Sequence, residues 1–357
     1  MALSCGLESR GRLLNILSRE YNILGNLQPR NEIKKQTNRL IMKEKEFKLI
    51  IDRERHEKDA QTYLSKHTEL LIDFINYGSS LIPRVYDSSN KKLEDIVVIA
   101  VLLKQVVAMI DAVEVLISKG AVSTSHLQAR AAFEASLYID WILQGDSEKK
   151  AKYYYVANLR NQRLWALRFK TGTPEEQIFS KAFEDIEKYI QHDDRGDLEK
   201  LADSEINKID SLLSMPGWVE ISNEFERVKN KKTGMERDWY KLFGVTSIRE
   251  LAKRVGRLGE YDLFYTRCSE VMHGASYKNH IQFRKGTIAF EPVRQLRDVH
   301  LVLRFILLTA ISTYISIIRH YRYGELSHFR RKYLQDWRRL FLNLPSVSYN
   351  IEVDNLL

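Results

Sequence analysis

Apolar residues recur three and four positions apart over long segments of the chain, which is the spacing of an amphipathic helix. The segment from Asn31 to about Asn76 is charged with spaced apolar residues, as in one long helix or a helix pair. Further helices are predicted over residues 96–118, 125–144, 149–170 and 175–191, after Trp218, from about Ser247, over 299–318, and in a last segment ending at Leu342. Only six prolines and 16 glycines interrupt the 357 residues. The pattern therefore predicts an all-α protein of about ten helices.

One segment departs from this pattern. Residues His280 to Phe290 alternate apolar and polar side chains on either side of Lys285-Gly286, and Pro292 follows. This alternation predicts one small β-hairpin at about residues 280–290. Residues 191–197 are polar, and we expect a solvated loop there rather than the His-Asp-Asp metal site that its residues would allow. We divide the chain into an N-terminal helical arm (1–60), a helical domain (61–320) and a basic aromatic C-terminal helix and tail (321–357).

Two apolar stretches, at 96–117 and 305–318, resemble membrane spans in composition. The first carries Lys104, Asp111 and Glu114, and the second has about fourteen largely apolar residues, short of the roughly twenty that cross a bilayer. We therefore interpret both as buried helices of a soluble core. The first 25 residues carry five charges and no apolar signal segment. We expect a cytoplasmic protein that does not bind a membrane.

The chemistry-bearing motifs of several large enzyme classes are absent from the sequence. There is no phosphate-binding G-x-x-x-x-G-K-[ST] loop, no G-x-G-x-x-G after a strand, no H-E-x-x-H and no G-x-S-x-G. Two cysteines are too few for a disulfide framework or a four-cysteine zinc site. We expect no metal and no cofactor.

Arg130 and Glu134 are four residues apart on a helical stripe whose other members, such as Tyr138 and Trp141, are apolar or aromatic. A charged pair on such a face has a desolvation cost unless the two groups bind each other or further donors. The pair therefore indicates either a functional site or an internal bridge that fixes helix register.

Tyr265, Ser269 and His273 follow at spacings of four and form one predicted ridge, which Gly274 ends as a helix cap. The Ser269 hydroxyl could hold the imidazole in one tautomer. A histidine in the last turn of a helix is suited to acid–base catalysis. Alternatively, the three groups satisfy one another inside the core.

Arg267 and His273 are separated by five residues, a spacing that also occurs from Arg294 to His300 and from Arg322 to His328. The spacing alone therefore does not identify a site, and the surrounding residues have to distinguish the three pairs. On a helix, the first pair lies about 120° apart, so the two side chains can flank a common groove.

The context for Arg267 and His273 is a family resemblance. The run Gln128-Ala-Arg130-Ala-Ala-Phe-Glu134, the pair Trp239-Tyr240, and Tyr261-x3-Tyr265-x3-Ser269-x3-His273-Gly resemble, in order and spacing, an uncharacterised prokaryotic family, the domain of unknown function 5677. The resemblance covers about residues 60–320.

That family is in turn similar to the HEPN superfamily of α-helical domains. The Arg-x4-6-His motif of that superfamily implies metal-independent RNA cleavage in toxin and phage-defence systems. The resemblance implies a HEPN-like bundle over residues 61–320, with Arg267 and His273 as catalytic residues. HEPN domains commonly pair, which implies a homodimer. This chain departs from the motif at Cys268, where HEPN proteins usually have Asn, Asp or His.

The net charge of +9 is concentrated near the C-terminus. The segment from Arg319 to Arg339 contains seven basic and two acidic residues, which gives a local charge of +5. The candidate nucleic-acid ligands are Arg319, Arg322, Arg330, Arg331, Lys332 and Arg338. Interleaved aromatic residues, among them Phe329 and Trp337, could stack on unpaired bases. The alternative is an amphipathic capping helix whose aromatic side chains belong to the core.

We therefore expect an endoribonuclease effector of a prokaryotic defence or toxin system. His273 would move the proton of the 2′-hydroxyl or of the leaving oxygen, and Arg267 would stabilise the phosphate. Tyr265, Ser269, Arg130 and Glu134 would complete the site. RNA is the expected partner, with DNA and an activator or antitoxin protein as further ones. The alternative is a non-catalytic helical module that binds a protein or a nucleotide and contains a buried polar network.

Overall fold

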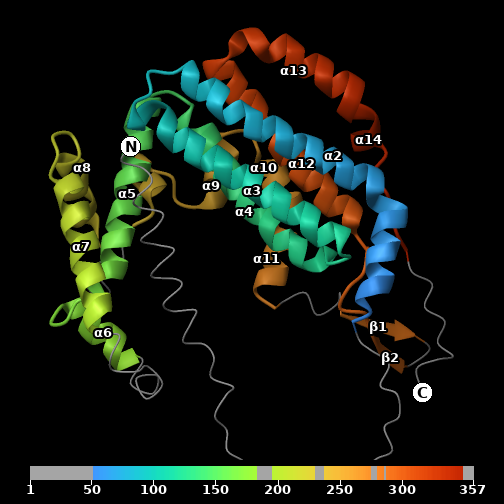
Figure 1. Cartoon of the computed structure of the whole chain (residues 1–357), viewed down its shortest axis with the longest axis horizontal. Coiled ribbons are helices and arrows are strands. Elements are labelled where there is room, and N and C mark those ends of the chain that lie inside the picture. Colours follow the sequence, from blue (N-terminus) through green and yellow to red (C-terminus); the bar gives the residue numbers. More distant parts are fainter. Residues whose placement is uncertain (1–50, 183–194, 230–236, 275–279, 285–286, 349–357) are drawn as a thin grey trace, which may run out of the picture. The chain divides into compact units, whose positions relative to one another are not determined.

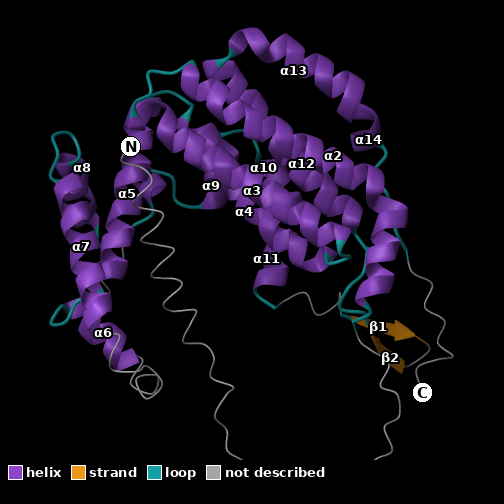
Figure 2. Cartoon of the chain, in the orientation of Figure 1, coloured by secondary structure: helices purple, strands orange, loops and turns teal. Residues whose placement is uncertain are grey.

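The computed structural model describes residues 51–182, 195–229, 237–274, 280–284 and 287–348, which are mostly helical (Figures 1 and 2). The chain divides into two compact units. The main unit contains Leu49–Tyr155 and Trp239–Leu357, and the second unit contains Val156–Asp238. The all-α fold class expected from the sequence is therefore observed. Both unit boundaries lie inside the segment 61–320, which the sequence analysis treats as one domain.

Four long helices form the centre of the main unit (Figure 1). They are α2 (Arg53–Asp87), α3 (Val98–Ser118, preceded by the π-turn η3, Leu93–Val97), α4 (Val122–Ile142) and α12 (Val299–Tyr321). Each packs against two or more of the others, so the four make a closed bundle. The bundle follows from the apolar spacing that the sequence shows, because residues three and four apart on each helix face its interior.

Helices α2 and α12 pack closely at Gly78. A Cβ atom built at this glycine would lie 2.3 Å from the phenol oxygen of Tyr314 and 2.6 Å from Cγ2 of Val107. The Tyr314 hydroxyl donates to the carbonyl oxygen of Phe74 (2.9 Å), in the same helix as Gly78. Tyr314 is fully buried, so only glycine leaves room for its ring at this crossing.

The two most apolar helical segments are Leu93–Ser118 and Val299–Tyr321. Both are long and apolar enough to cross a membrane by length and composition, a test that core helices of soluble proteins also pass. In the bundle, Ile110 of α3 and Ile306 of α12 are fully buried.

The C-terminal helices cover α2. They are η9 (Tyr323–Glu325), α13 (Leu326–Lys332), η10 (Tyr333–Trp337) and α14 (Arg338–Leu342). The rings of Trp337 and Phe74 are stacked with centroids 3.9 Å apart, and the indole N–H of Trp337 donates to Oδ2 of Asp73 (2.7 Å). Phe329 joins the same aromatic cluster. These contacts make the C-terminal segment part of the main core.

Shorter elements lie between α4 and α12 in the chain. They are η6 (Trp239–Phe243), α9 (Ile248–Arg254), α10 (Leu258–Glu260), the π-turn η7 (Tyr261–Tyr265) and α11 (Thr266–Met272). The helix predicted from about Ser247 is confirmed, because the Ser247 hydroxyl accepts from the N–H of Glu250 (3.1 Å) and caps α9. Strands β1 (Ile281–Arg284) and β2 (Thr287–Phe290) pair antiparallel, with Ile281 opposite Phe290. Lys285 and Gly286, the predicted turn between them, lie outside the described residues.

The second unit consists of the end of α5 (Ser147–Leu167, which begins in the main unit), α6 (Pro174–Ala182), α7 (Arg195–Leu213) and α8 (Val219–Val228). Arg163 of α5 binds Asp210 of α7 through Nε (2.6 Å), around a small core of Ala166, Ala202 and Ile206. The predicted loop 191–197 is wrong at its end, because α7 already begins at Arg195; residues 191–194 lie outside the described residues.

Candidate functional site

Two side chains of α4 and one that directly precedes α11 form a closed hydrogen-bonded triangle. The guanidinium of Arg130 in α4 donates from Nε to Oε1 of Glu134, one turn later (3.2 Å), and from Nη2 to the phenol oxygen of Tyr265 (2.8 Å). The phenol of Tyr265 in turn donates to Oε1 of Glu134. The structure thus brings together residues of two separate sequence motifs.

The triangle is buried on the Tyr265 side and partly open on the other. Tyr265 is 4% exposed, whereas the side chains of Arg130 and Glu134 are 18% and 30% exposed. Burial raises the pKa of the Tyr265 phenol far above its usual range, and the neighbouring Glu134 raises it further. The phenol therefore stays protonated at neutral pH and acts as a hydrogen-bond donor rather than as a general base.

Arg130 also contacts the far end of the helix that follows Tyr265. Its Nη1 atom lies 2.7 Å from the sulfur of Met272, the last residue of α11, and its guanidinium lies over the Tyr265 ring, 4.6 Å from the centroid. Tyr265 directly precedes α11. One arginine of α4 therefore contacts both ends of α11, the helix that carries Arg267, and thereby fixes its position on α4.

His273 lies where α11 ends, as the sequence predicts. Its N–H donates to the carbonyl of Ser269 (3.0 Å), and Gly274 follows with a positive φ of 66°, so the predicted glycine cap is confirmed. The His273 side chain is exposed. The expected hydrogen bond from Ser269 to the imidazole is not made, because the Ser269 hydroxyl donates to the backbone carbonyl of Tyr265 (3.1 Å). Ser269 thus stabilises the turn before α11 instead of orienting His273.

Arg267 is exposed and lies near a histidine that the sequence analysis missed. Burial lowers the pKa of His126, and the nearby charges of Asp298 and Arg267 act on it in opposite directions. The imidazole also contacts the Val122 carbonyl through Nδ1 (3.1 Å). His126 precedes Arg130 by four residues, so the spacing that reveals Arg130 and Glu134 extends one turn further back and could have found it.

Cys268, which follows Arg267, points into the core. It is 2% exposed, and burial raises the pKa of its thiol to about 12. A thiol of this kind stays protonated and is not a nucleophile at neutral pH. The residue at this motif position therefore serves packing in this chain.

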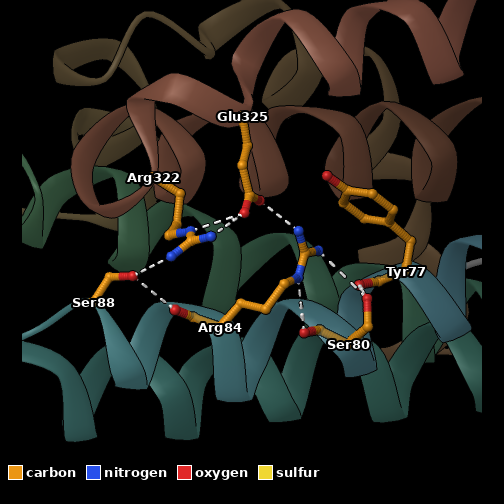
Figure 3. Close-up of polar contacts among 6 residues, drawn as sticks. All are labelled: Tyr77, Ser80, Arg84, Ser88, Arg322 and Glu325. Carbon is orange, nitrogen blue, oxygen red and sulfur yellow. Dashed lines mark hydrogen bonds and ion pairs between the residues drawn. The ribbon is translucent and has the colours of Figure 1, made fainter.

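The basic C-terminal stretch is partly used for internal ion pairs. Figure 3 shows Arg322 and Arg84 converging on the carboxylate of Glu325, with Arg322 also donating to the Ser88 hydroxyl (2.6 Å). Lys332 binds Oδ2 of Asp73 (2.8 Å). Of the six candidate nucleic-acid ligands, Arg322 and Lys332 thus hold the C-terminal helices on α2.

The aromatic part of that prediction is wrong for two residues. Phe329 and Trp337 are 2% and 0% exposed, so their ring faces lie against the core and cannot stack on bases. The exposed side chains of this segment include the basic Arg319, Arg330, Arg331 and Arg338, together with Tyr323 and Leu334. The segment is a capping element with a solvated basic face.

No group of three or more His, Cys, Asp and Glu side chains in the described part of the chain is arranged to hold a metal ion. The His-Asp-Asp triplet considered at 192–194 lies outside the described residues.

Comparison with known protein families identifies a match for this chain. The sequence profile described as "Family of unknown function (DUF5677)" matches residues 95–287, which is more than half of the chain. The matched range includes α4 and α11 with the triangle, and ends before the basic C-terminal helices. No curated protein and no solved structure matches the chain.

Proposed function

We propose, from the premise that this chain belongs to the DUF5677 family of unknown function, that it is a HEPN-like ribonuclease that cleaves RNA without a metal ion. The cleavage site would be the face of the main unit where α11 lies on α4. The proposal includes a role as effector of a prokaryotic defence or toxin system.

The observation that carries the proposal is the double contact of Arg130. Through Tyr265 and Met272 it holds both ends of α11, while Arg267 and His273 remain exposed. Catalytic groups need a fixed position more than a buried one, since misplacement by about 1 Å can reduce a rate about a hundredfold. Arg130, Glu134 and Tyr265 are positioning residues in this account.

The chemistry is transesterification within RNA. The ribose 2′-oxygen forms a bond to phosphorus as the bond to the 5′-oxygen breaks, leaving a 2′,3′-cyclic phosphate and a free 5′-hydroxyl. The base that takes the 2′-proton and the acid that protonates the leaving oxygen are both needed. His273 supplies one of these groups and Arg267 stabilises the charge on the phosphate. A homodimer would bring a second His273 for the other proton transfer, and an activator or antitoxin protein would control the activity.

The test is incubation of the purified full-length protein with transfer RNA and total RNA in the presence of EDTA. We expect discrete fragments that end in 2′,3′-cyclic phosphate. The proposal would be contradicted if the RNA stays intact after prolonged incubation, both with the protein as purified and with its isolated dimer.

One observation favours a second function. The triangle is closed on itself, and Ser269 binds its own helix backbone, as in a polar network that only stabilises a fold. In that case the chain is a non-catalytic helical module for a protein or nucleotide partner. In that case the wild type does not cleave RNA, and replacing the exposed His273 does not change the stability of the protein.

A further inference from the structure

A polar cavity of about 520 Å³ lies in the main unit, at the C-terminal end of α4, and none of the triangle residues lines it. The end of α4, the segment after α9 and the last turns of α12 surround it. Its polar lining includes Asp140, Arg257, Ser316, Arg319 and His320. Its size is within the range of about 300 to 1,000 Å³ that small-molecule sites occupy.

The inner part of the cavity is formed by a buried ion pair. Arg257 and Asp140 are 7% and 8% exposed, and Nη1 of Arg257 lies 3.0 Å from Oδ2 of Asp140. The same guanidinium donates to both carboxylate oxygens of Glu260, at 3.0 and 2.7 Å. One buried cation thus faces two carboxylates, those of Asp140 and Glu260.

The unused acceptor at this end is Oδ1 of Asp140. It is buried and has no hydrogen-bond partner of good geometry among the described residues, although the Ser316 hydroxyl faces the same carboxylate. A buried carboxylate oxygen without a donor has a desolvation cost that a bound donor would remove. The position therefore suits an ammonium or another N–H group.

The outer part of the cavity has basic side chains. Arg319 and His320 line it and are exposed, and Arg319 is one of the residues that the sequence predicts to bind nucleic acid. Leu143, Val255 and Ile315 supply the apolar part of the cavity wall. A ligand with a positive donor at one end and an acidic group at the other would match both.

We propose that this cavity binds a small zwitterion, with its amine at Asp140 and its acidic group at Arg319. The acidic group is a carboxylate, as in a free amino acid, or a phosphate, as in an aminoalkyl phosphate. The shared chemistry is an amine and an acid separated by a short apolar spacer. This site does not depend on the proposed ribonuclease activity.

The test is calorimetric titration of the full-length protein with two sets of probes. One set is the twenty free L-amino acids, and the other is O-phospho-L-serine and phosphoethanolamine. Methylamine, acetate and inorganic phosphate, each with only one of the two groups, serve as ligand controls. We expect at least one zwitterion to bind, and the set to which it belongs identifies the acidic group.

Variants connect binding to the cavity. Arg319→Gln changes an exposed side chain and should weaken binding at least about tenfold with the fold intact, whereas Arg330→Gln, outside the cavity, should leave it unchanged. Asp140→Asn, with its folding checked by circular dichroism, should weaken binding of the amine. The proposal is overturned if neither probe set binds at millimolar concentration, or if Arg319→Gln binds as the wild type does.

Discussion

The phenol of Tyr265 donates a hydrogen bond to the carboxylate of Glu134, across 131 residues of sequence. Arg130 binds both groups, so one charged residue of α4 and one aromatic residue before α11 share a carboxylate. The relationship fixes α11 on α4, and with it the direction in which Arg267 and His273 face solvent. The stability and the proposed activity of the protein therefore both depend on this triangle.

Replacing Tyr265 by Phe removes the hydroxyl that donates to Glu134 and accepts from Arg130. We expect the free energy of unfolding to fall by about 1–3 kcal/mol, because a partly buried carboxylate loses a donor. Tyr323→Phe is the matched control, since Tyr323 is 73% exposed. Urea denaturation of both variants measures the difference, and equal midpoints would show that the triangle does not stabilise the fold.

Replacing Gly78 by Ala places a methyl group against the Tyr314 hydroxyl and Val107. We expect destabilisation by about 1–3 kcal/mol, as for other overpacked cores. Gly259→Ala provides the comparison, because nothing lies within 4 Å of a Cβ at that position. Thermal unfolding of the two variants measures the effect. A Gly78→Ala protein as stable as Gly259→Ala would mean that α2 and α12 are not in close contact.

Three histidines predict how stability depends on pH. Burial lowers the pKa of His56, His67 and His126 in the folded protein below the usual histidine value of about 6.5. The unfolded chain therefore binds more protons than the folded one as pH falls below about 6.5, and stability decreases there. We expect a lower urea midpoint at about pH 5.5 than at about pH 7.5.

His67→Leu is the variant that tests this cause, since His67 is 8% exposed. It should reduce the difference between the two pH values. His328→Leu, at an exposed position, should not. A pH dependence that is identical in the wild type and His67→Leu would assign the effect to other groups.

The basic C-terminal helices predict a graded effect on RNA binding. Arg330 and Arg331 are exposed, whereas Arg322 is occupied by Glu325. The double variant Arg330→Gln, Arg331→Gln should reduce the slope of log K against log salt by about one for each lost phosphate contact. Arg322→Gln should change stability more than this slope. Filter binding over a range of salt concentrations distinguishes the two, and an unchanged slope in the double variant would place RNA elsewhere.

The main helices could be predicted because their apolar spacing is strong. The helix predicted over 299–318 is observed as Val299–Tyr321, and that over 96–118 as η3 followed by α3. The start of α7 was missed because it contains Gly196 and Asp197, which favour turns. Tertiary packing overrides that local preference in the second unit.

The candidate site could be predicted in part for the same reason. Arg130 and Glu134 are visible as charges on an apolar stripe, and Tyr265 as part of a regular ridge. The bridge between Arg130 and Glu134 is one of the two interpretations that the sequence allows, but the contact of both groups with Tyr265 could not be predicted, since it joins two segments that are far apart in the sequence. The π-turn at Tyr261–Tyr265 also changes the regular spacing of the ridge, and the Ser269 hydroxyl binds a backbone carbonyl that no side-chain pattern indicates.

The cavity beside Asp140 has no sequence signal at all. Asp140 and Arg257 are 117 residues apart, and neither belongs to a recognised motif. Arg319 was recognised as part of a charge cluster, but its place beside the buried pair depends on how α12 packs on α4.

The central claim is tested most directly by cleavage of transfer RNA in EDTA by the wild type, His273→Ala and His328→Ala. Both histidines are exposed and each follows an arginine by six residues, so His328 is a matched control for charge and spacing. The account predicts fragments with 2′,3′-cyclic phosphate ends from the wild type and His328→Ala, and intact RNA with a folded His273→Ala protein. Equal cleavage by His273→Ala would contradict it.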